Sequence, residues 1–215
     1  MRPVICMITA MVPASAAEDR TVIERVGAAA RAGVHLIQVR QPQLEGRALA
    51  RMVEASIRAA KGTEARILVN ERVDVALAAG AHGVHLRGDS MSAARVRRMA
   101  PEAFLIGRSV HSPDEAARLA QGGGLDYLIF GAVFETSSKP GVPPAGPGAL
   151  ALACTASVLP VLAVGGMAPA RLGGVARAGA AGFAAIGLFA DGPLDTIALA
   201  VQQASSAFDT SGRVP

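Results

Sequence analysis

Aromatic and charged side chains are both scarce in this sequence. Only 3% of the 215 residues are aromatic, with one Tyr and no Trp, so modules that stack nucleic-acid bases on aromatic rings are disfavoured. Charged residues make up 18%, and the net charge of +4 is spread along the chain without a run of five basic residues. Such a modest excess suits a small anionic ligand better than a nucleic-acid backbone. We therefore expect no nucleic-acid partner.

Long apolar runs and clustered cysteines are also missing. No apolar run reaches the roughly 20 residues that a bilayer span needs, so we expect no membrane association. Cys6 and Cys154 lie far apart and match no metal-ligand spacing, which favours a reduced, cytoplasmic compartment. The N-terminal stretch MRPVICMITAMVPASAA has the look of a secretory signal. We interpret Val4 to Ala10 instead as the first buried strand, because the repeat described next needs it.

Apolar residues, at 51%, are abundant enough for a large core. Short β-prone runs alternate with Ala-rich amphipathic stretches, a pattern typical of helices that cover a parallel sheet. Strands are predicted at Val4 to Ala10, Val34 to Arg40, Arg66 to Asn70, Gly83 to Leu86, Phe104 to Ser109, Tyr127 to Val133, Pro160 to Val164 and Gly182 to Ile186. Helices are predicted at Glu18 to Ala32, Gly46 to Lys61, Val73 to Ala79, Ser92 to Ala100, Ser112 to Gln121, Gly148 to Ala156, Pro169 to Ala178 and Pro193 to Ala207.

Several predicted helix ends carry their own signals. Ser112, Pro113 and Glu115 have the spacing of an N-cap, a first helical residue and a capping-box partner. Three glycines each follow an Ala-rich helix and precede the next strand, as helix-ending glycines do: Gly33, Gly80 and Gly179. The recurrence of this joint indicates one repeated unit.

Eight strand–helix units in about 200 residues predict a (β/α)8 TIM barrel at the small end of its size range, with residues 1–215 forming one domain. The alternative is an open doubly wound sheet. It is disfavoured because no strand is followed by a G-x-G-x-x-G turn with a downstream acid. In a barrel the chemistry belongs at the C-terminal ends of the strands.

Polar residues mark the ends of the second and third predicted strands. Leu36, Gln38 and Arg40 share one face by the period of two, so polarity would rise toward the mouth of the barrel. Arg40 would be a cation at the strand tip, or else half of a salt bridge on the rim. Asn70 could bind a polar ring edge, and Glu71 could act as an acid/base or metal ligand.

The fourth and fifth strands end in the segments GVHLRGDS and GRSVHS. His85 and Arg87 share a face, with Asp89 beyond the strand. We expect His85 to be a hydrogen-bonded core residue rather than a catalyst. Ser109 and His111 share a face at the next tip, where the following helix N-terminus favours a neutral imidazole. Functional and structural roles for His111 remain equally open at this point.

Two later segments predict an anion site. The long stretch from Phe134 to Gly148 indicates a lid or binding loop, although a flexible linker is the alternative. Its residues Thr136, Ser138 and Lys139 supply two hydroxyls and a cation, which suit phosphate oxygens. Gly165 and Gly166 allow close backbone approach after the seventh strand. Backbone donors after strands seven and eight form the phosphate site that recurs in this fold.

The segments QVR, VNERVDVALAAGAHGVHL, IGRSVHSPDEA, DYLIFGAVFETSSKPG, VLAVGGM and AGAAGFAAIGLF, taken in order, resemble the thiamine phosphate synthase and thiazole tautomerase (TenI-like) superfamily of small barrels. The resemblance covers about Val34 to Phe189. It implies a role in thiamine biosynthesis and a thiazole phosphate ligand. That ligand would be bound through Gly165, Gly166, Ile186 and Gly187.

The synthase branch releases diphosphate from a pyrimidine methyl group, which calls for Mg²⁺ and cationic side chains. Its usual Q-x-R-E-K signature keeps Gln38 and Arg40 here, but Gln41 and Pro42 replace the acid and the lysine. Of its two metal acids, Glu71 takes the first place. The G-Q-[DE]-D motif reads Arg87, Gly88, Asp89, Ser90 in this chain, so Ser90 stands at the second metal position unless Asp89 substitutes.

The tautomerase branch needs one acid/base and a phosphate anchor to move a proton between an exocyclic and a ring carbon. GRSVHS and FGAVFET look more like this branch, but its histidine after Phe-Gly is Ala132 here. We nevertheless predict a TenI-like thiazole tautomerase, an isomerase without a cofactor. His111 or Glu71 would shuttle the proton, Arg40 would meet the substrate carboxylate, and Lys139 would close the loop.

Two rival functions stay open. One is a thiamine phosphate synthase, a transferase that would use Mg²⁺. The other is a non-catalytic regulator that binds thiazole or thiamine phosphates. The sequence leaves the oligomeric state undetermined, although an apolar chain with few charges would suit a homodimer.

Overall fold

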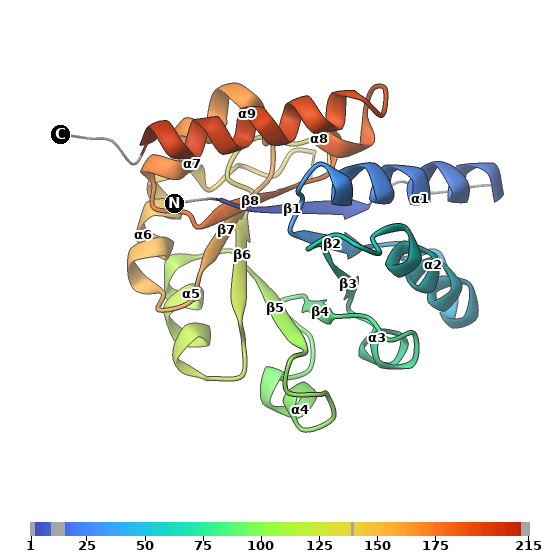
Figure 1. The fold of residues 1–215 in the computed structure, drawn as a ribbon. Coiled ribbons are helices and arrows are strands. Elements are labelled where there is room, and N and C mark those ends of the chain that lie inside the picture. The colour runs from blue at the N-terminus through green and yellow to red at the C-terminus, as the bar shows by residue number, and fades with distance from the viewer. Residues whose placement is uncertain (1–2, 10–15, 139, 212–215) are drawn as a thin grey trace.

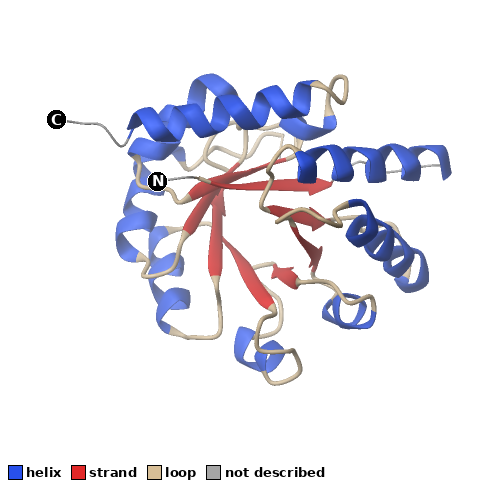
Figure 2. Ribbon diagram, in the orientation of Figure 1, coloured by secondary structure: helices blue, strands red, loops and turns tan. Residues whose placement is uncertain are grey.

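The structure is a computed structural model that describes residues 3–9, 16–138 and 140–211. Eight parallel strands close into a barrel in chain order, and β1 pairs with both β2 and β8. Helices surround the strands (Figure 1), and Figure 2 shows the strands in red inside the blue helices. The predicted TIM barrel is confirmed, and the open doubly wound alternative is wrong.

The strands are β1 (Val4–Thr9), β2 (Leu36–Val39), β3 (Arg66–Asn70), β4 (Gly83–Leu86), β5 (Leu105–Val110), β6 (Tyr127–Gly131), β7 (Val161–Val164) and β8 (Gly182–Ala185). The helices are α1 (Ala16–Arg31), α2 (Gly46–Ala59), α3 (Val73–Ala78), α4 (Ala93–Arg97), α5 (Pro113–Gln121), α6 (Gly146–Ala156), α7 (Pro169–Arg177), α8 (Gly187–Ala190) and α9 (Thr196–Ser211). Each predicted strand is present: β3 and β4 have the predicted bounds, and the other six differ by one or two residues at one or both ends. The predicted end of the first, Ala10, lies outside the described residues.

The three helix-ending glycines adopt the same left-handed turn. At Gly33, with φ of 97°, the amide donates to the carbonyl three residues back, and the Val34 amide donates to the carbonyl five residues back. This pair of bonds defines a Schellman motif, and it recurs at Gly80 and Gly179. Because the Val34 amide belongs to the turn, β2 begins only at Leu36, later than predicted.

The barrel has two separate apolar layers. One fills the interior and consists of Cys6, Ile8, Leu36, Leu68, Tyr127, Ile129, Leu162 and Ala184. The larger one lies between the sheet and the helices and contains the alternate residues, such as Ile37 and Val39 on β2. Gln38, on the interior face one step beyond Leu36, is only 2% exposed. The predicted rise in polarity along β2 is therefore confirmed.

The start of α5 matches its sequence signals. The Ser112 hydroxyl accepts a hydrogen bond from the Glu115 amide at 3.1 Å, and Pro113 opens the helix. The Glu115 carboxylate reaches back to the His111 amide at 2.8 Å, one residue before the N-cap. This bond fixes the backbone of His111, which directly follows the C-terminal end of β5 at the mouth of the barrel.

The long loop after β6 is as long as predicted but lies two residues earlier, between Gly131 at the end of β6 and Gly146 at the start of α6. It closes at its base, where the Ala145 amide donates to Ala132 at 2.9 Å and the Gly146 amide donates to Val133 at 3.1 Å. Helix α6 begins at Gly146 rather than at the predicted Gly148, with a proline in its first turn. The closed base holds the loop over the ends of β6 and β7.

Helix α8 is an element that the sequence analysis missed, because a single apolar turn has no periodicity to detect. The helix predicted from Pro193 begins instead at Thr196, as α9. Phe189 anchors α8 with no exposed surface. The buried Arg25 of α1 donates to the carbonyls of Phe189, at 3.0 Å, and Gly192. Helix α8 is thus tied to α1 across the barrel seam.

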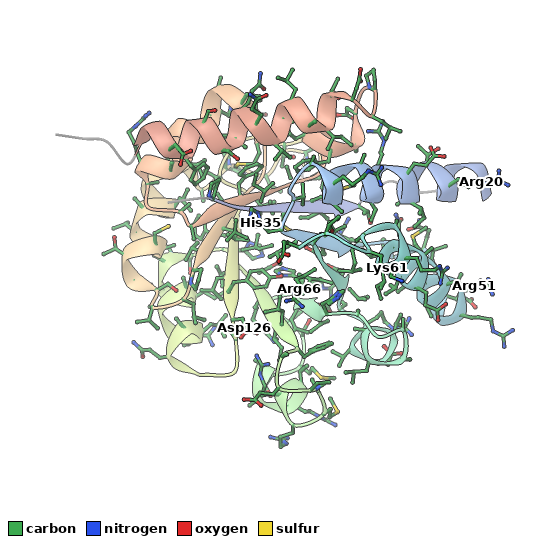
Figure 3. The ribbon with its side chains drawn as sticks, viewed as in Figure 1. Arg20, His35, Arg51, Lys61, Arg66 and Asp126 are labelled. Atoms are coloured by element: carbon green, nitrogen blue, oxygen red, sulfur yellow. The ribbon has the colours of Figure 1, made fainter. Side chains whose placement is uncertain are left out.

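The outer surface carries a cavity of about 420 Å³ between α1 and α2. Ile23 and Met52 line it, and Arg20 and Arg51 flank it from the two helices (Figure 3). It lies among the outer helices and not at the C-terminal ends of the strands, where the active sites of this fold are found. Within the described ranges, no helix is long and apolar enough to cross a bilayer.

Closure of the barrel predicts a strong effect at Gly182. A Cβ atom there would lie 1.9 Å from the Val4 carbonyl oxygen, so β1 and β8 would have to separate. Gly182→Ala should lower the free energy of unfolding by about 3 kcal/mol, as measured by urea denaturation. Gly148→Ala is the matched control, since its Cβ meets nothing within 4 Å on α6. A control loss as large as that of Gly182→Ala would contradict the seam as the cause.

Candidate active site at the mouth of the barrel

Two adjoining cavities open at the C-terminal ends of the strands. The central cavity, about 240 Å³, lies over the barrel axis, and the lateral cavity, about 340 Å³, lies over β7, β8 and the start of α8. They share five lining residues: Thr136, Ser138, Val164, Gly165 and Ile186. The two cavities therefore meet at the loop after β6.

Most of the residues singled out from the sequence line these cavities. In the central cavity are Gln38, Arg40, Asn70, Ser109, His111, Thr136 and Ser138. In the lateral cavity are Gly165, Gly166, Ile186 and Gly187. Glu71 lies beside the central cavity rather than in its lining. Lys139 falls outside the described residues.

Gln38 and Asn70 form a polar pair at the ends of β2 and β3. The Gln38 Nε2 group donates to Asn70 Oδ1 at 2.8 Å. Because that oxygen is occupied, the Asn70 amide presents its NH₂ group as the donor on its other side. The Gln38 Oε1 atom is buried without a partner in the described part of the chain. The pair can therefore orient a polar ring edge with a donor from Asn70.

His85 is a buried, uncharged member of the site. Its Nε2 lies 2.9 Å from Ser109 Oγ, and its Nδ1 lies 3.3 Å from the Tyr127 hydroxyl. Burial, with the charge of Arg108 adding to it, lowers the pKa of His85 to about 3. The predicted hydrogen-bonded core role is the one that the geometry supports. His85 positions Ser109 at the floor of the central cavity.

His111 presents one free ring nitrogen to the central cavity. Its Nδ1 lies 2.5 Å from the Gly131 carbonyl oxygen, and because a carbonyl only accepts, Nδ1 carries the proton. In the neutral ring Nε2 is then a hydrogen-bond acceptor. The geometry is compatible with a functional role for His111, one of the two roles that its sequence position leaves open.

The ends of β3 and β4 are joined by a cluster of charged and polar groups. Glu71 has a left-handed backbone, with φ of 65°, and its Oε1 accepts bonds from the Arg87 amide and the Ser90 hydroxyl. Its Oε2 lies 3.6 Å from Arg87 Nε. The Arg87 guanidinium also pairs with Asp89 at 3.2 Å. Arg87 lines the central cavity, so this cluster places a cation there.

Arg108 holds the loop after β4 from behind. Its side chain is nearly buried and donates to the carbonyls of Gly88, at 3.1 Å, and Met91. Burial lowers the pKa of Arg108, while the nearby Glu71 opposes that shift. Because carbonyl oxygens satisfy its donors, Arg108 fixes the loop that carries Asp89.

The lining of the lateral cavity includes three glycines, Gly165, Gly166 and Gly187. Gly165 and Gly166 have φ values of 100° and 61°, which favour glycine. A Cβ on Gly165 would lie 2.6 Å from that of Ala132, and one on Gly166 would lie 2.4 Å from the Glu135 carbonyl oxygen. No described residue accepts a hydrogen bond from the amides of Gly165, Gly166 or Gly187. These donors are available to an anion.

Sequence reasoning missed some lining residues. Asp191 lines the lateral cavity, and its Oδ2 would lie 3.0 Å from a Cβ on Gly187. No local pattern predicts it, because it follows the undetected helix α8. The position of Arg87 in the cavity could have been predicted from the sequence, since the period of two places it on the same face as His85. Arg40 lines the cavity and forms no salt bridge with any residue that the structure describes, so the alternative of a rim ion pair is not supported.

A thiamine monophosphate synthase family model matches residues 8–189. This chain belongs to that family. It is 38% identical to a thiamine-phosphate synthase of Chlorobium luteolum over 185 residues, covering 86% of this chain and 84% of the relative. A thiamine-phosphate synthase of Methanoculleus marisnigri is 37% identical over 199 residues, covering 90% of this chain and 92% of the relative.

Solved structures share the fold. A thiamine phosphate pyrophosphorylase from Pyrococcus furiosus superposes with a TM-score of 0.80 at 26% identity, covering 96% of each chain. A 3-hexulose-6-phosphate synthase superposes with a TM-score of 0.71 at 17% identity, covering 96% of this chain and 99% of that one. The second likeness concerns the barrel alone.

The predicted tautomerase, and with it the isomerase class, is wrong. The relatives at 37–38% identity are named for the synthase. The structure supplies a physical reason, because Ala132 lines the central cavity with only a methyl group where the tautomerase has its histidine. The tautomerase reaction was the basis for the proton-shuttle role predicted for His111 or Glu71 and for the carboxylate-binding role predicted for Arg40. Both roles therefore fall with that reaction.

The low pKa of His85 predicts an acid-dependent loss of stability. An unfolded histidine titrates near 6.5, so below that pH the unfolded state binds a proton that the folded state, with its pKa of about 3, does not. The free energy of unfolding should fall by about 1.4 kcal/mol per pH unit between roughly pH 6 and 4 because of this group. His85→Gln should remove that component. Urea titrations at several pH values would test this, and equal slopes for both proteins would contradict it.

Proposed function

We propose that this protein is a thiamine-phosphate synthase, which joins hydroxymethylpyrimidine diphosphate to thiazole phosphate and releases diphosphate. The observation that carries the proposal is the pair of adjoining cavities that meet at Thr136, Ser138 and Gly165. A reaction between two phosphorylated substrates needs two sites that share a boundary. Family membership supports the same reading.

The reaction requires no net proton transfer at the bond-forming atoms. The C–O bond between the pyrimidine methylene and diphosphate breaks, and diphosphate leaves with the electron pair. The lone pair of the thiazole nitrogen then forms the new C–N bond, which leaves the ring as a cation. The protein must stabilise a transient carbocation and the growing negative charge on the leaving group.

The thiazole phosphate would occupy the lateral cavity. The amides of Gly165, Gly166 and Gly187, which have no acceptor among the described residues, would bind the phosphate oxygens, with Ile186 against the ring edge. This arrangement follows the phosphate site that recurs after strands seven and eight of such barrels. The thiazole ring would then point across Gly165 toward the central cavity.

The pyrimidine would occupy the central cavity. Ile8 and Ile129 provide apolar walls, and the Asn70 amide, oriented by Gln38, would donate to the ring edge. The His111 Nε2 lone pair and Ser109 would face the positive charge that develops on the methylene carbon. These groups are held by their hydrogen bonds before substrate binds, which is how enzymes stabilise developing charge.

The diphosphate would lie between the cavities and the loop after β6. Thr136 and Ser138, whose hydroxyl oxygens are 3.1 Å apart, would donate to its oxygens, and Arg40 would pair with its charge. Lys139 is expected to join them from the same loop. The cytoplasm as the compartment and a homodimer as the assembly stay predictions from composition.

Mg²⁺ is the cofactor that the family resemblance attaches to this reaction, and the residues at its two positions do not fit it. Mg²⁺ requires octahedral oxygen ligands at about 2.0–2.1 Å. Glu71 Oε1 is already occupied by two donors, including the fixed Arg87 amide, and Ser90 offers a neutral hydroxyl. Asp89, the possible substitute, is paired with the Arg87 guanidinium at 3.2 Å. Among the described residues no three His, Cys, Asp or Glu side chains form a metal-binding group.

The proposal predicts that purified protein forms thiamine phosphate and diphosphate from the two substrates, measured by chromatography of both products. Thr136→Val should lower kcat/KM by roughly 100-fold, because it removes a donor to the leaving group. Thr155→Val on the exposed side of α6 is the matched control and should keep wild-type rates. Tight binding of thiazole phosphate without any turnover would overturn the synthase and favour a non-catalytic binder.

A further inference from the structure

The cluster at the ends of β3 and β4 contains a cation where the family pattern would have a metal. Arg87 stands at the glycine of the G-Q-[DE]-D motif, and Ser90 stands at its second acid. Glu71 and Ser90, the two metal positions, contact each other directly through a hydrogen bond. Arg87 Nε lies 3.6 Å from the remaining oxygen of Glu71. The guanidinium therefore lies beside Glu71, which in turn contacts Ser90.

The Arg87 guanidinium has donors to spare. A guanidinium carries five N–H groups, and here Nε faces Glu71 while one N–H of Nη2 faces Asp89. No described residue pairs with Nη1. Two carboxylates thus pair with the side chain, which is 61% exposed. The remaining N–H groups are left for a ligand in the central cavity, which Arg87 lines.

The supports of Arg87 are themselves fixed. The Arg87 amide donates to Glu71, so the backbone at the tip of β4 is tied to the tip of β3. Arg108 clamps the following loop through the carbonyls of Gly88 and Met91. Because these bonds hold the backbone around Arg87, that backbone loses little conformational freedom when an anion binds.

We propose that Arg87 is the built-in cation that receives the departing diphosphate, in place of a divalent metal. The inference rests on the proposed synthase function. As the C–O bond breaks, its electron pair moves onto the diphosphate oxygen, and the planar guanidinium can bind two phosphate oxygens in parallel. Arg87 would also replace the positive charge lost where Pro42 stands instead of the family lysine.

The first test measures binding of inorganic diphosphate by calorimetry, with EDTA and then with excess Mg²⁺. Wild-type affinity should change by less than about 3-fold between the two conditions, and Arg87→Gln should weaken it by about 10-fold or more. Arg95→Gln, which removes the same charge from an exposed site on α4, should bind like the wild type. Affinity that rises about 10-fold with Mg²⁺, or that is unchanged in Arg87→Gln, would overturn the proposal.

The second test rebuilds the family pattern. Arg87→Gly combined with Ser90→Asp removes the guanidinium and restores the missing acid. Synthase turnover of this double variant should become dependent on Mg²⁺, with a loss of about 10-fold or more in EDTA, whereas wild-type turnover should persist in EDTA. Circular dichroism and the melting temperature would confirm that the variant is folded.

The outcomes separate the two proposals. Wild-type turnover that appears only with Mg²⁺ would overturn the role of Arg87 and leave the synthase function intact. Absence of thiamine phosphate with and without Mg²⁺ would overturn the synthase function. The diphosphate-binding measurement would still decide in that case whether Arg87 is the anion-binding cation.

Discussion

The hydrogen-bonded seam between β8 and β1 is the constraint on which the rest of the molecule depends. Val4 pairs with Gly182, and this pairing converts a twisted parallel sheet into a closed cylinder. Because all strands are parallel, closure brings their C-terminal ends to one mouth. This closure explains why residues as distant in sequence as Gln38 and Gly187 line cavities at the same mouth. Gly182 permits the seam because a Cβ there would collide with the Val4 backbone.

The interior changes from apolar to polar along the barrel axis. The lower layer is apolar and contains Tyr127, which occupies the space that a side chain on Gly107 would need. Above it His85 is held neutral by burial and joins Tyr127 to Ser109. Among the described lining residues, the charged ones are Arg40, Arg87, Glu135 and Asp191, at the rim. The site therefore combines an uncharged floor with a charged rim, on which Arg40 and Arg87 can meet anionic substrates.

The departures of this chain from the family pattern fall in one place. Gln41, Pro42, Arg87 and Ser90 all differ from the synthase signatures, and they lie just beyond the ends of β2 and β4. Three of these changes remove a charge, because Gln41 and Ser90 stand where the signatures have acids and Pro42 stands where they have a lysine, and the fourth adds a guanidinium. The glycines of the lateral cavity, by contrast, lie in segments that carry the family resemblance. Under the proposed function, the changes concern the side of the site assigned to the leaving group, and the side assigned to the thiazole phosphate keeps its glycines.

Local sequence features determined the strands, most helices and the barrel itself. The alternation of β-prone runs with Ala-rich helices, and the glycine that ends three of those helices, can be recognised from residues close together in the chain. They also placed Gln38, Arg40, Ser109 and His111 at the barrel mouth, where these residues line the central cavity, since the period of two decides which face a side chain takes. The sequence did not predict helix α8 or Asp191, because a single apolar turn has no periodicity.

The prediction of a tautomerase rather than a synthase was wrong because it compared short segments with each other, whereas the relatives match along most of the chain. Only the tertiary structure decided that Glu71, Arg87 and Ser90 form one cluster and that the two cavities share a wall. Those contacts join residues on different strands and loops, and barrel closure, not proximity along the chain, sets the distances between them.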